Sequence, residues 1–422
     1  MSLFRRTGLG VDNPESVTIQ AASHAAIAVP ALLIAGILWL WRRPRLLPLP
    51  QLRTGTWTGR DVFLAYLVMN LMPPLISMLL RGSGPLPDGD NPEDLGRRLL
   101  WLAPAILPAI LAANFLLMHW IASTRPADIG FSFVRIVPHA ILGILGFAIA
   151  TPLLLGLYLA LLQVWTTEPH FLEKIALERT LNTIEWGLLW FQAAVFAPII
   201  EEWFFRGVLQ GWLRRASPLG HALVLMSTFL VGAIPLMNHL SKTNAKEAKD
   251  VEAQVKAAND LDAGLATLTF AAVLGCIYGV GAVRSWQPLI REGLDWFLPL
   301  EAKGKRPAIP EAEASEAMDD DDDVAAEEQE KLDDERMEEI IRQPKWRAWQ
   351  ESLARLSVFG SAMLFAMFHM TWPAPVPIFL LGVVLGWLRL RTNNLWPGIL
   401  MHSLFNQVAF VALLWGALNP SK

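Results

Sequence analysis

The chain contains a single cysteine, Cys276, which falls in an apolar segment. Intrachain disulfides and cysteine-rich metal sites are therefore excluded. Charged residues are also scarce, at 18% of the chain against about 25% in a typical soluble domain. The sequence contains no basic patch typical of a nucleic-acid surface, and we expect no nucleic-acid partner.

Apolar residues are what the chain has in excess. Hydrophobic residues make up 53% of it, 18 residues are Trp, and the mean hydropathy is +0.37. This composition predicts a multi-pass protein whose surroundings are the lipid bilayer. It excludes a typical water-soluble protein of this length.

Apolar runs of close to the spanning length, about 20 residues for a helix, recur along the chain. They cover residues 21–41, 62–80, 99–122, 136–164, 187–200, 220–237, 264–283, 353–369, 376–390 and 396–415. Continuous apolar runs are typical of helices, which satisfy every backbone group in lipid. We therefore predict an all-α polytopic bundle of about ten transmembrane helices. The first run is too long for a cleavable signal, so we expect it to remain as a helix.

Three segments break the apolar pattern. Residues 166–182 mix apolar and charged positions, which fits an amphipathic interfacial helix or a plain connecting helix. Residues 241–262 predict a short solvated helix. The centre of residues 284–347, with an aspartate run at 319–323, has too little apolar surface to fold alone, so we predict a disordered acidic insertion. Its aspartates form a solvated loop or, alternatively, bind an ion or a partner.

Three polar patches interrupt helices that are otherwise apolar. They read Glu201-Glu202-x-x-x-Arg206, Phe365-x-x-x-His369 and His402-x-x-x-Asn406. An ionisable side chain at mid-membrane costs about 2.5 to 3.5 kcal/mol on insertion scales, so such residues in three helices need a reason. A shared polar site inside the bundle is the reason that we predict.

The first patch predicts a division of roles between its glutamates. Glu202 and Arg206 are four residues apart and can pair on one helix face, whereas Glu201 projects about 100° away. An internal pair of Glu202 and Arg206 would leave Glu201 free for proton transfer. Glu201 is therefore our candidate general base.

The other two patches supply hydrogen-bonding groups. His402 and Asn406 are four residues apart, so both can donate to one developing oxyanion. His369 lies one turn after Phe365, at a helix end. It would help Glu201 to hold a water or, alternatively, join Glu201 and His402 as ligands of a divalent metal such as zinc.

The three motifs, in this order and in apolar helices, resemble those of the CPBP intramembrane proteases. That family includes type II CAAX prenyl endopeptidases and Abi-like proteins of bacteriocin processing or self-immunity. The resemblance implies an endopeptidase that acts on a membrane-associated protein or peptide, in the cell membrane of a prokaryote. It also implies the label of a metalloprotease.

The resemblance also implies a role for each motif residue. Glu201 would act as base on a water that it shares with His369. His402 and Asn406 would stabilise the oxyanion, and Glu202 and Arg206 would support the site.

The same resemblance divides the chain into four parts. Residues 1–123 form N-terminal transmembrane helices, and residues 124–218 form the first part of the protease core. Residues 219–352 form an insertion with two extra spans, and residues 353–417 form the second part of the core.

Two other classes of function compete with a protease. A proton- or ion-coupled transporter would use the same residues as a relay, but it predicts inverted repeats, and the sequence has no such symmetry. A non-catalytic membrane scaffold would use the acidic insertion instead. Other membrane proteases are disfavoured because the sequence has no His-Glu-x-x-His motif and no Gly-x-Gly-Asp in an apolar run.

Overall fold

The computed structural model describes residues 57–79, 92–165, 176, 181–216, 218–243, 251–291, 344–369 and 371–419. The predicted first span, nearly all of the interfacial segment and the acidic centre of the insertion lie outside these residues. Within them every regular element is a helix, so the predicted all-α class is confirmed for this part of the chain.

The helices follow the apolar runs closely. They are α2 (Gly59–Leu79), α3 (Pro92–Ala122), α4 (Pro126–Ile129), α5 (Ile136–Leu162), a compound helix from Thr183 to Leu213, α10 (Pro218–Thr243), α11 (Val251–Arg291), α13 (Pro344–Met367), α14 (Pro375–Thr392) and α15 (Trp396–Leu418). Seven described helices are long and apolar enough to cross a membrane. The protein is therefore a multi-pass membrane protein, while a count of ten spans stays a prediction.

The compound helix alternates between α- and π-helical geometry. It consists of α7 (Thr183–Phe191), η2 (Gln192–Phe196), α8 (Ala197–Glu201), η3 (Glu202–Leu209) and α9 (Gln210–Leu213), with η2 and η3 as the π-helical segments. Pro198 explains the first of them, because a proline has no N–H to donate along the helix and crowds the preceding turn. Wide turns of this kind are frequent at functional sites.

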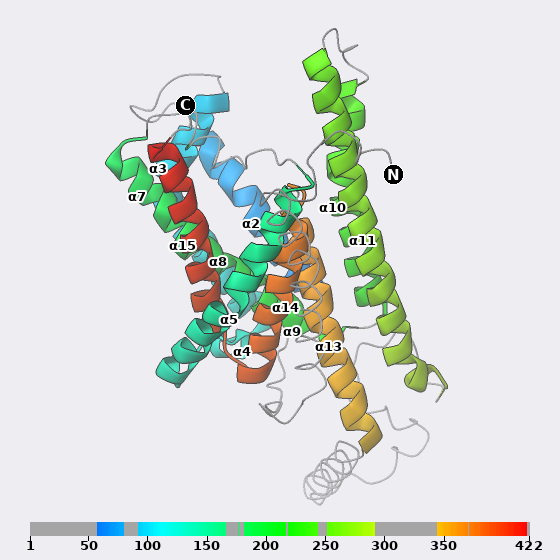
Figure 1. The fold of residues 1–422 in the computed structure, drawn as a ribbon. Coiled ribbons are helices and arrows are strands. Elements are labelled where there is room, and N and C mark those ends of the chain that lie inside the picture. Colours follow the sequence, from blue (N-terminus) through cyan, green and yellow to red (C-terminus); the bar gives the residue numbers. More distant parts are fainter. Residues whose placement is uncertain are drawn as a thin grey trace, which may run out of the picture.

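Helix α14 forms the centre of the bundle. In its most hydropathic stretch 67% of the residues are buried, against 22–28% in the other six candidate spans. Helices α13, α5 and α15 pack around α14, and α10 and α11 form a long pair that stands beside α13 (Figure 1). The outer helices expose large apolar side chains, including Ile141 and Ile149 on α5, as lipid contact requires.

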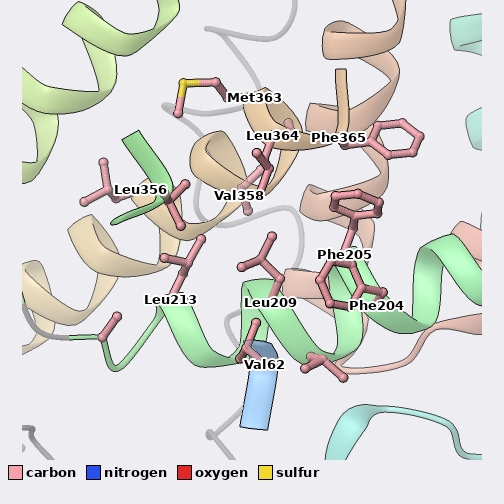
Figure 2. Close-up of a cluster of buried hydrophobic side chains, with 14 of the residues drawn as sticks. Val62, Phe204, Phe205, Leu209, Leu213, Leu356, Val358, Met363, Leu364 and Phe365 are labelled. Atoms are coloured by element: carbon pink, nitrogen blue, oxygen red, sulfur yellow. The ribbon is translucent and has the colours of Figure 1, made fainter. Parts of the chain in front are cut away.

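Small residues let the central helices approach closely. A Cβ atom on Gly382 of α14 would lie 3.0 Å from the Cβ of Ala362 on α13. Such small contacts are typical of helix packing in membranes, where van der Waals packing rather than water exclusion holds the helices together. Next to this contact, α13 lies across η3 and α9, with an edge-to-face pair of Phe205 and Phe365 at 5.1 Å between ring centroids (Figure 2).

The polar segments are more helical at their ends than the sequence predicted. Residues 241–262 were expected to form one short solvated helix, but 241–243 end α10 and 251–262 are the first turns of α11. The region expected as an insertion at 284–347 begins inside α11, which ends at Arg291, and its last residues already belong to α13. Charged residues within these turns extend the helices beyond the apolar stretch.

Candidate active site

A buried ion pair lies at the start of η3. The guanidinium nitrogen Nη1 of Arg206 lies 3.1 Å from Oε1 of Glu202, and the side chains are 0% and 1% exposed. The pair thus has the i, i+4 spacing that the sequence indicated. None of the three guanidinium nitrogens of Arg206 has a hydrogen-bond partner among the described residues, so the ion pair with Glu202 is the main compensation for its buried charge.

His402 connects α15 to both glutamates. Its Nδ1 lies 3.1 Å from Oε1 of Glu202, and this carboxylate oxygen accepts a hydrogen bond from the Nδ1–H group. Its Nε2 lies 3.6 Å from Oε2 of Glu201, which is too long for a direct hydrogen bond. The two atoms are near enough for one water molecule or substrate oxygen beside them to contact both.

Glu201 is the accessible member of this cluster. Its side chain is 26% exposed, whereas those of Glu202, Arg206 and His402 are 0–3% exposed. Oε2 of Glu201 is nevertheless buried and has no hydrogen-bond partner among the described residues. Glu201 therefore combines access from outside with an unsatisfied oxygen that faces His402.

Phe365 is in contact with three of the motif residues. The guanidinium of Arg206 lies over its ring, with the guanidinium carbon 4.1 Å from the ring centroid. It meets the rings of His369 and His402 edge-to-face, with centroids 4.9 and 5.7 Å away. The sequence identified Phe365 only as the start of a motif, but its ring is the packing surface that holds the two histidines and the guanidinium together.

His369 follows the end of α13 and has a defined orientation. Its Nδ1 lies 3.0 Å from the backbone carbonyl oxygen of Phe365. A carbonyl oxygen only accepts hydrogen bonds, so Nδ1 must carry the proton. In the neutral imidazole this leaves the lone pair on Nε2 for a water or another proton donor.

Asn406 is bound to the first π-helical segment rather than to the ion cluster. Its Nδ2 donates to the carbonyl oxygen of Ala193 at 2.9 Å. Two features leave that oxygen without a helical partner: the N–H of Ala197 donates to Gln192 instead, and Pro198 has no N–H. Asn406 thus satisfies a carbonyl that the π-turn sets free, and this contact was not predictable from the motif.

The described residues contain no preformed metal site. Among the described residues, no group of three or more His, Cys, Asp or Glu side chains has an arrangement that could hold a metal ion. Nδ1 of His402 is hydrogen-bonded to Glu202, and Nδ1 of His369 is hydrogen-bonded to the backbone carbonyl oxygen of Phe365. The arrangement of Glu201, His369 and His402 therefore does not fit a preformed metal centre.

Gly398, in the first turn of α15, is a further residue that the site requires. A Cβ atom there would lie 2.7 Å from Oε2 of Glu202. Glu202 has little freedom to move away, because its other oxygen is bound to Arg206 and His402. The backbone of α15 thus approaches the buried carboxylate more closely than any side chain permits.

We expect Gly398→Ala to lower the stability by about 1 to 3 kcal/mol, the usual cost of overpacking, and to reduce activity further by displacing Glu202. Thermal unfolding in detergent and hydrolysis of a membrane peptide measure the two effects. Gly416→Ala on the same helix is the matched control, because a Cβ atom there has no neighbour within 4 Å. Equal behaviour of the two variants would show that the close approach is unimportant.

Comparison with known proteins agrees with the motifs. Residues 183–289 and 337–408 match the family model described as type II CAAX prenyl endopeptidase Rce1-like. The first matched stretch contains the Glu-Glu motif and most of the α10–α11 pair, and the second contains both histidine motifs. Neither the curated proteins nor the solved structures give a match to the chain. The part of the chain that carries the three motifs thus belongs to a family of CAAX prenyl endopeptidases within the CPBP proteases, as those motifs predicted.

Proposed function

We propose that the protein is an intramembrane endopeptidase that hydrolyses a peptide bond of a membrane-associated protein by means of a water activated by Glu201. The observation that carries this proposal is the 3.6 Å separation between Oε2 of Glu201 and Nε2 of His402, inside a cluster that is otherwise buried. The matched family, which consists of peptide hydrolases, supports the same reaction class.

In the proposed reaction Glu201 accepts a proton as the water oxygen attacks the carbonyl carbon of the scissile bond. His369, with its Nε2 lone pair available, shares that water as a hydrogen-bond acceptor. The charge that develops on the carbonyl oxygen is stabilised by a hydrogen bond from Nε2 of His402. For this, both ring nitrogens of His402 must carry a proton, which makes His402 a positively charged imidazolium. The two positive charges of His402 and Arg206 then balance the negative charges of the two glutamates.

Collapse of the tetrahedral intermediate completes hydrolysis. The C–N bond breaks, the proton held by Glu201 passes to the leaving amine, and the new carboxyl group carries the water oxygen. No covalent acyl-enzyme forms, and no step is assigned to a metal. A divalent metal such as zinc, which the sequence left open as an alternative, stays a prediction.

Asn406 and the ion pair have supporting roles in this proposal. Asn406 holds the π-turn of η2 in place through Ala193, about two turns before the helix reaches Glu201. The pair of Glu202 and Arg206 fixes His402 through Nδ1, in the way that a carboxylate orients a catalytic imidazole. An oxyanion role for Asn406 stays a prediction. One hydrogen of its amide group is donated to Ala193, so the other hydrogen would have to donate to the oxyanion.

Purified protein in liposomes should cleave a peptide that carries a C-terminal CAAX motif and a prenyl group, with the product masses identifying the bond. An unprenylated peptide with a hydrophobic anchor is the comparison substrate, and it decides whether the prenyl group matters. His402→Ala should abolish cleavage of both. A protein that cleaves neither, but moves protons across the same liposomes, would favour the transporter, and a protein that does neither would favour the scaffold.

A further inference from the structure

Three arginines meet at one end of the bundle, away from the catalytic cluster. Arg214 and Arg215 follow α9, and Arg389 lies in the last turn of α14. Arg389 and Arg215 are close enough to Arg214 for their charges to repel its charge. The proposed reaction uses none of the three.

Two of these guanidinium groups are fixed in position. Arg389 is buried, with Nη2 donating to the carbonyl oxygen of Ile129 at 2.8 Å and Nη1 donating to Oδ1 of Asn393. Arg215 stacks over Trp57, 4.8 Å from the ring centroid, and donates to the Trp57 carbonyl oxygen at 3.3 Å. Both oxygens that Arg389 contacts are neutral, so these hydrogen bonds supply no negative charge.

Arg214 lies near both of them. Among the residues that the structure describes, it forms no hydrogen bond and no ion pair, and its Nε is buried and unsatisfied. Burial, and then the neighbouring charges of Arg389 and Arg215, lower the pKa of Arg214 from 12.5 to about 9. A partly buried cation that is held beside two other cations is destabilised until an anion neutralises it.

The position of Arg214 relative to the membrane indicates the kind of anion. Arg214 directly follows Leu213, where the membrane-spanning stretch of the compound helix ends. Trp57 stacks with the adjacent Arg215, and Trp212 stands two residues before Arg214 in the chain. Tryptophan is enriched at the level of the lipid headgroups. Basic pockets between transmembrane helices at this level bind anionic headgroups, and a guanidinium matches phosphate with paired hydrogen bonds.

We propose that Arg214, with Arg215 and Arg389, binds a phosphate group at the membrane surface, supplied by the headgroup of an anionic phospholipid. The guanidinium of Arg214 would donate to the phosphate oxygens, and the fixed charges of the other two would strengthen the attraction. This site goes beyond the proposed hydrolysis, and it would link α9 to α14 through the lipid.

Native mass spectrometry of the purified protein tests the proposal, with phosphatidylglycerol, phosphatidylcholine or inorganic phosphate added separately. We expect the wild-type protein to retain phosphatidylglycerol in preference to phosphatidylcholine, and Arg214→Gln to lower that retention at least tenfold. The matched control is Arg355→Gln, because Arg355 is partly exposed and already paired with Glu351. Its retention should equal that of the wild-type protein.

The remaining outcomes also decide the question. Stabilisation by inorganic phosphate alone, lost in Arg214→Gln, would support the phosphate site and identify free phosphate as its source. Equal retention of both lipids by the wild-type protein would overturn the proposal without any variant, so the test holds even where Arg214→Gln fails to fold. Equal phosphatidylglycerol retention by Arg214→Gln and the wild-type protein would overturn it as well.

Discussion

Glu201→Gln is expected to slow peptide-bond hydrolysis by about 10²- to 10⁴-fold, the range that a positioned acid or base contributes. Glutamine keeps the size of the side chain and its ability to hydrogen-bond a water, but it cannot take the proton. The fold should be unaffected, because Glu201 is 26% exposed and its closest ionic contact is the 3.6 Å approach to His402. Single-turnover cleavage in proteoliposomes measures the rate without interference from product release.

The comparison variants separate a chemical effect from a structural one. Glu351→Gln removes a partly exposed carboxylate on α13 and should leave both rate and melting temperature unchanged. Glu202→Gln removes a buried carboxylate that binds Arg206 and His402, so it should lower both. If Glu201→Gln retained activity within tenfold of the wild-type protein, the base would have to be another residue, and the proposed reaction would be wrong.

The sequence predicted the helices well because membrane spans depend on local composition. It could not tell which span is central. Helix α14 has a mean hydropathy of 1.4 in its best stretch, below the 2.3 of α5, yet α14 is the more buried of the two. Contact with lipid and contact with apolar protein require the same residues, so hydropathy does not distinguish them.

The candidate site was predictable in its residues but not in its contacts. The i, i+4 spacing identified the pair of Glu202 and Arg206, because both residues lie on one helix. The bond between His402 and Glu202 joins residues 200 positions apart, and no local pattern encodes it. The roles of Gly398 and of the Ala193 carbonyl were missed for the same reason, since each depends on how closely α15 approaches the compound helix.

Arg206→Met is expected to destabilise the protein by about 3 to 5 kcal/mol, the usual cost of leaving one partner of a buried ion pair uncompensated. Arg206 is fully buried, and its removal would leave His402 as the one ionic contact of Glu202 among the described residues. Methionine fills a similar volume against the ring of Phe365, so the loss of stability would result mainly from the missing positive charge. The melting temperature of the purified protein in detergent measures it.

The pair of Arg355 and Glu351 is a matched control, because it has the same i, i+4 spacing but side chains that are 40% and 38% exposed. Arg355→Met should cost no more than about 1 kcal/mol, as exposed pairs do. The double variant Glu202→Gln with Arg206→Met removes both buried charges, so it should melt at a higher temperature than Arg206→Met alone. It should nevertheless remain inactive, because the imidazolium of His402 then has no carboxylate at Nδ1. A melting temperature of Arg206→Met equal to that of Arg355→Met would mean that Glu202 is already neutral in the folded protein, and the proposed charge balance of the site would fail.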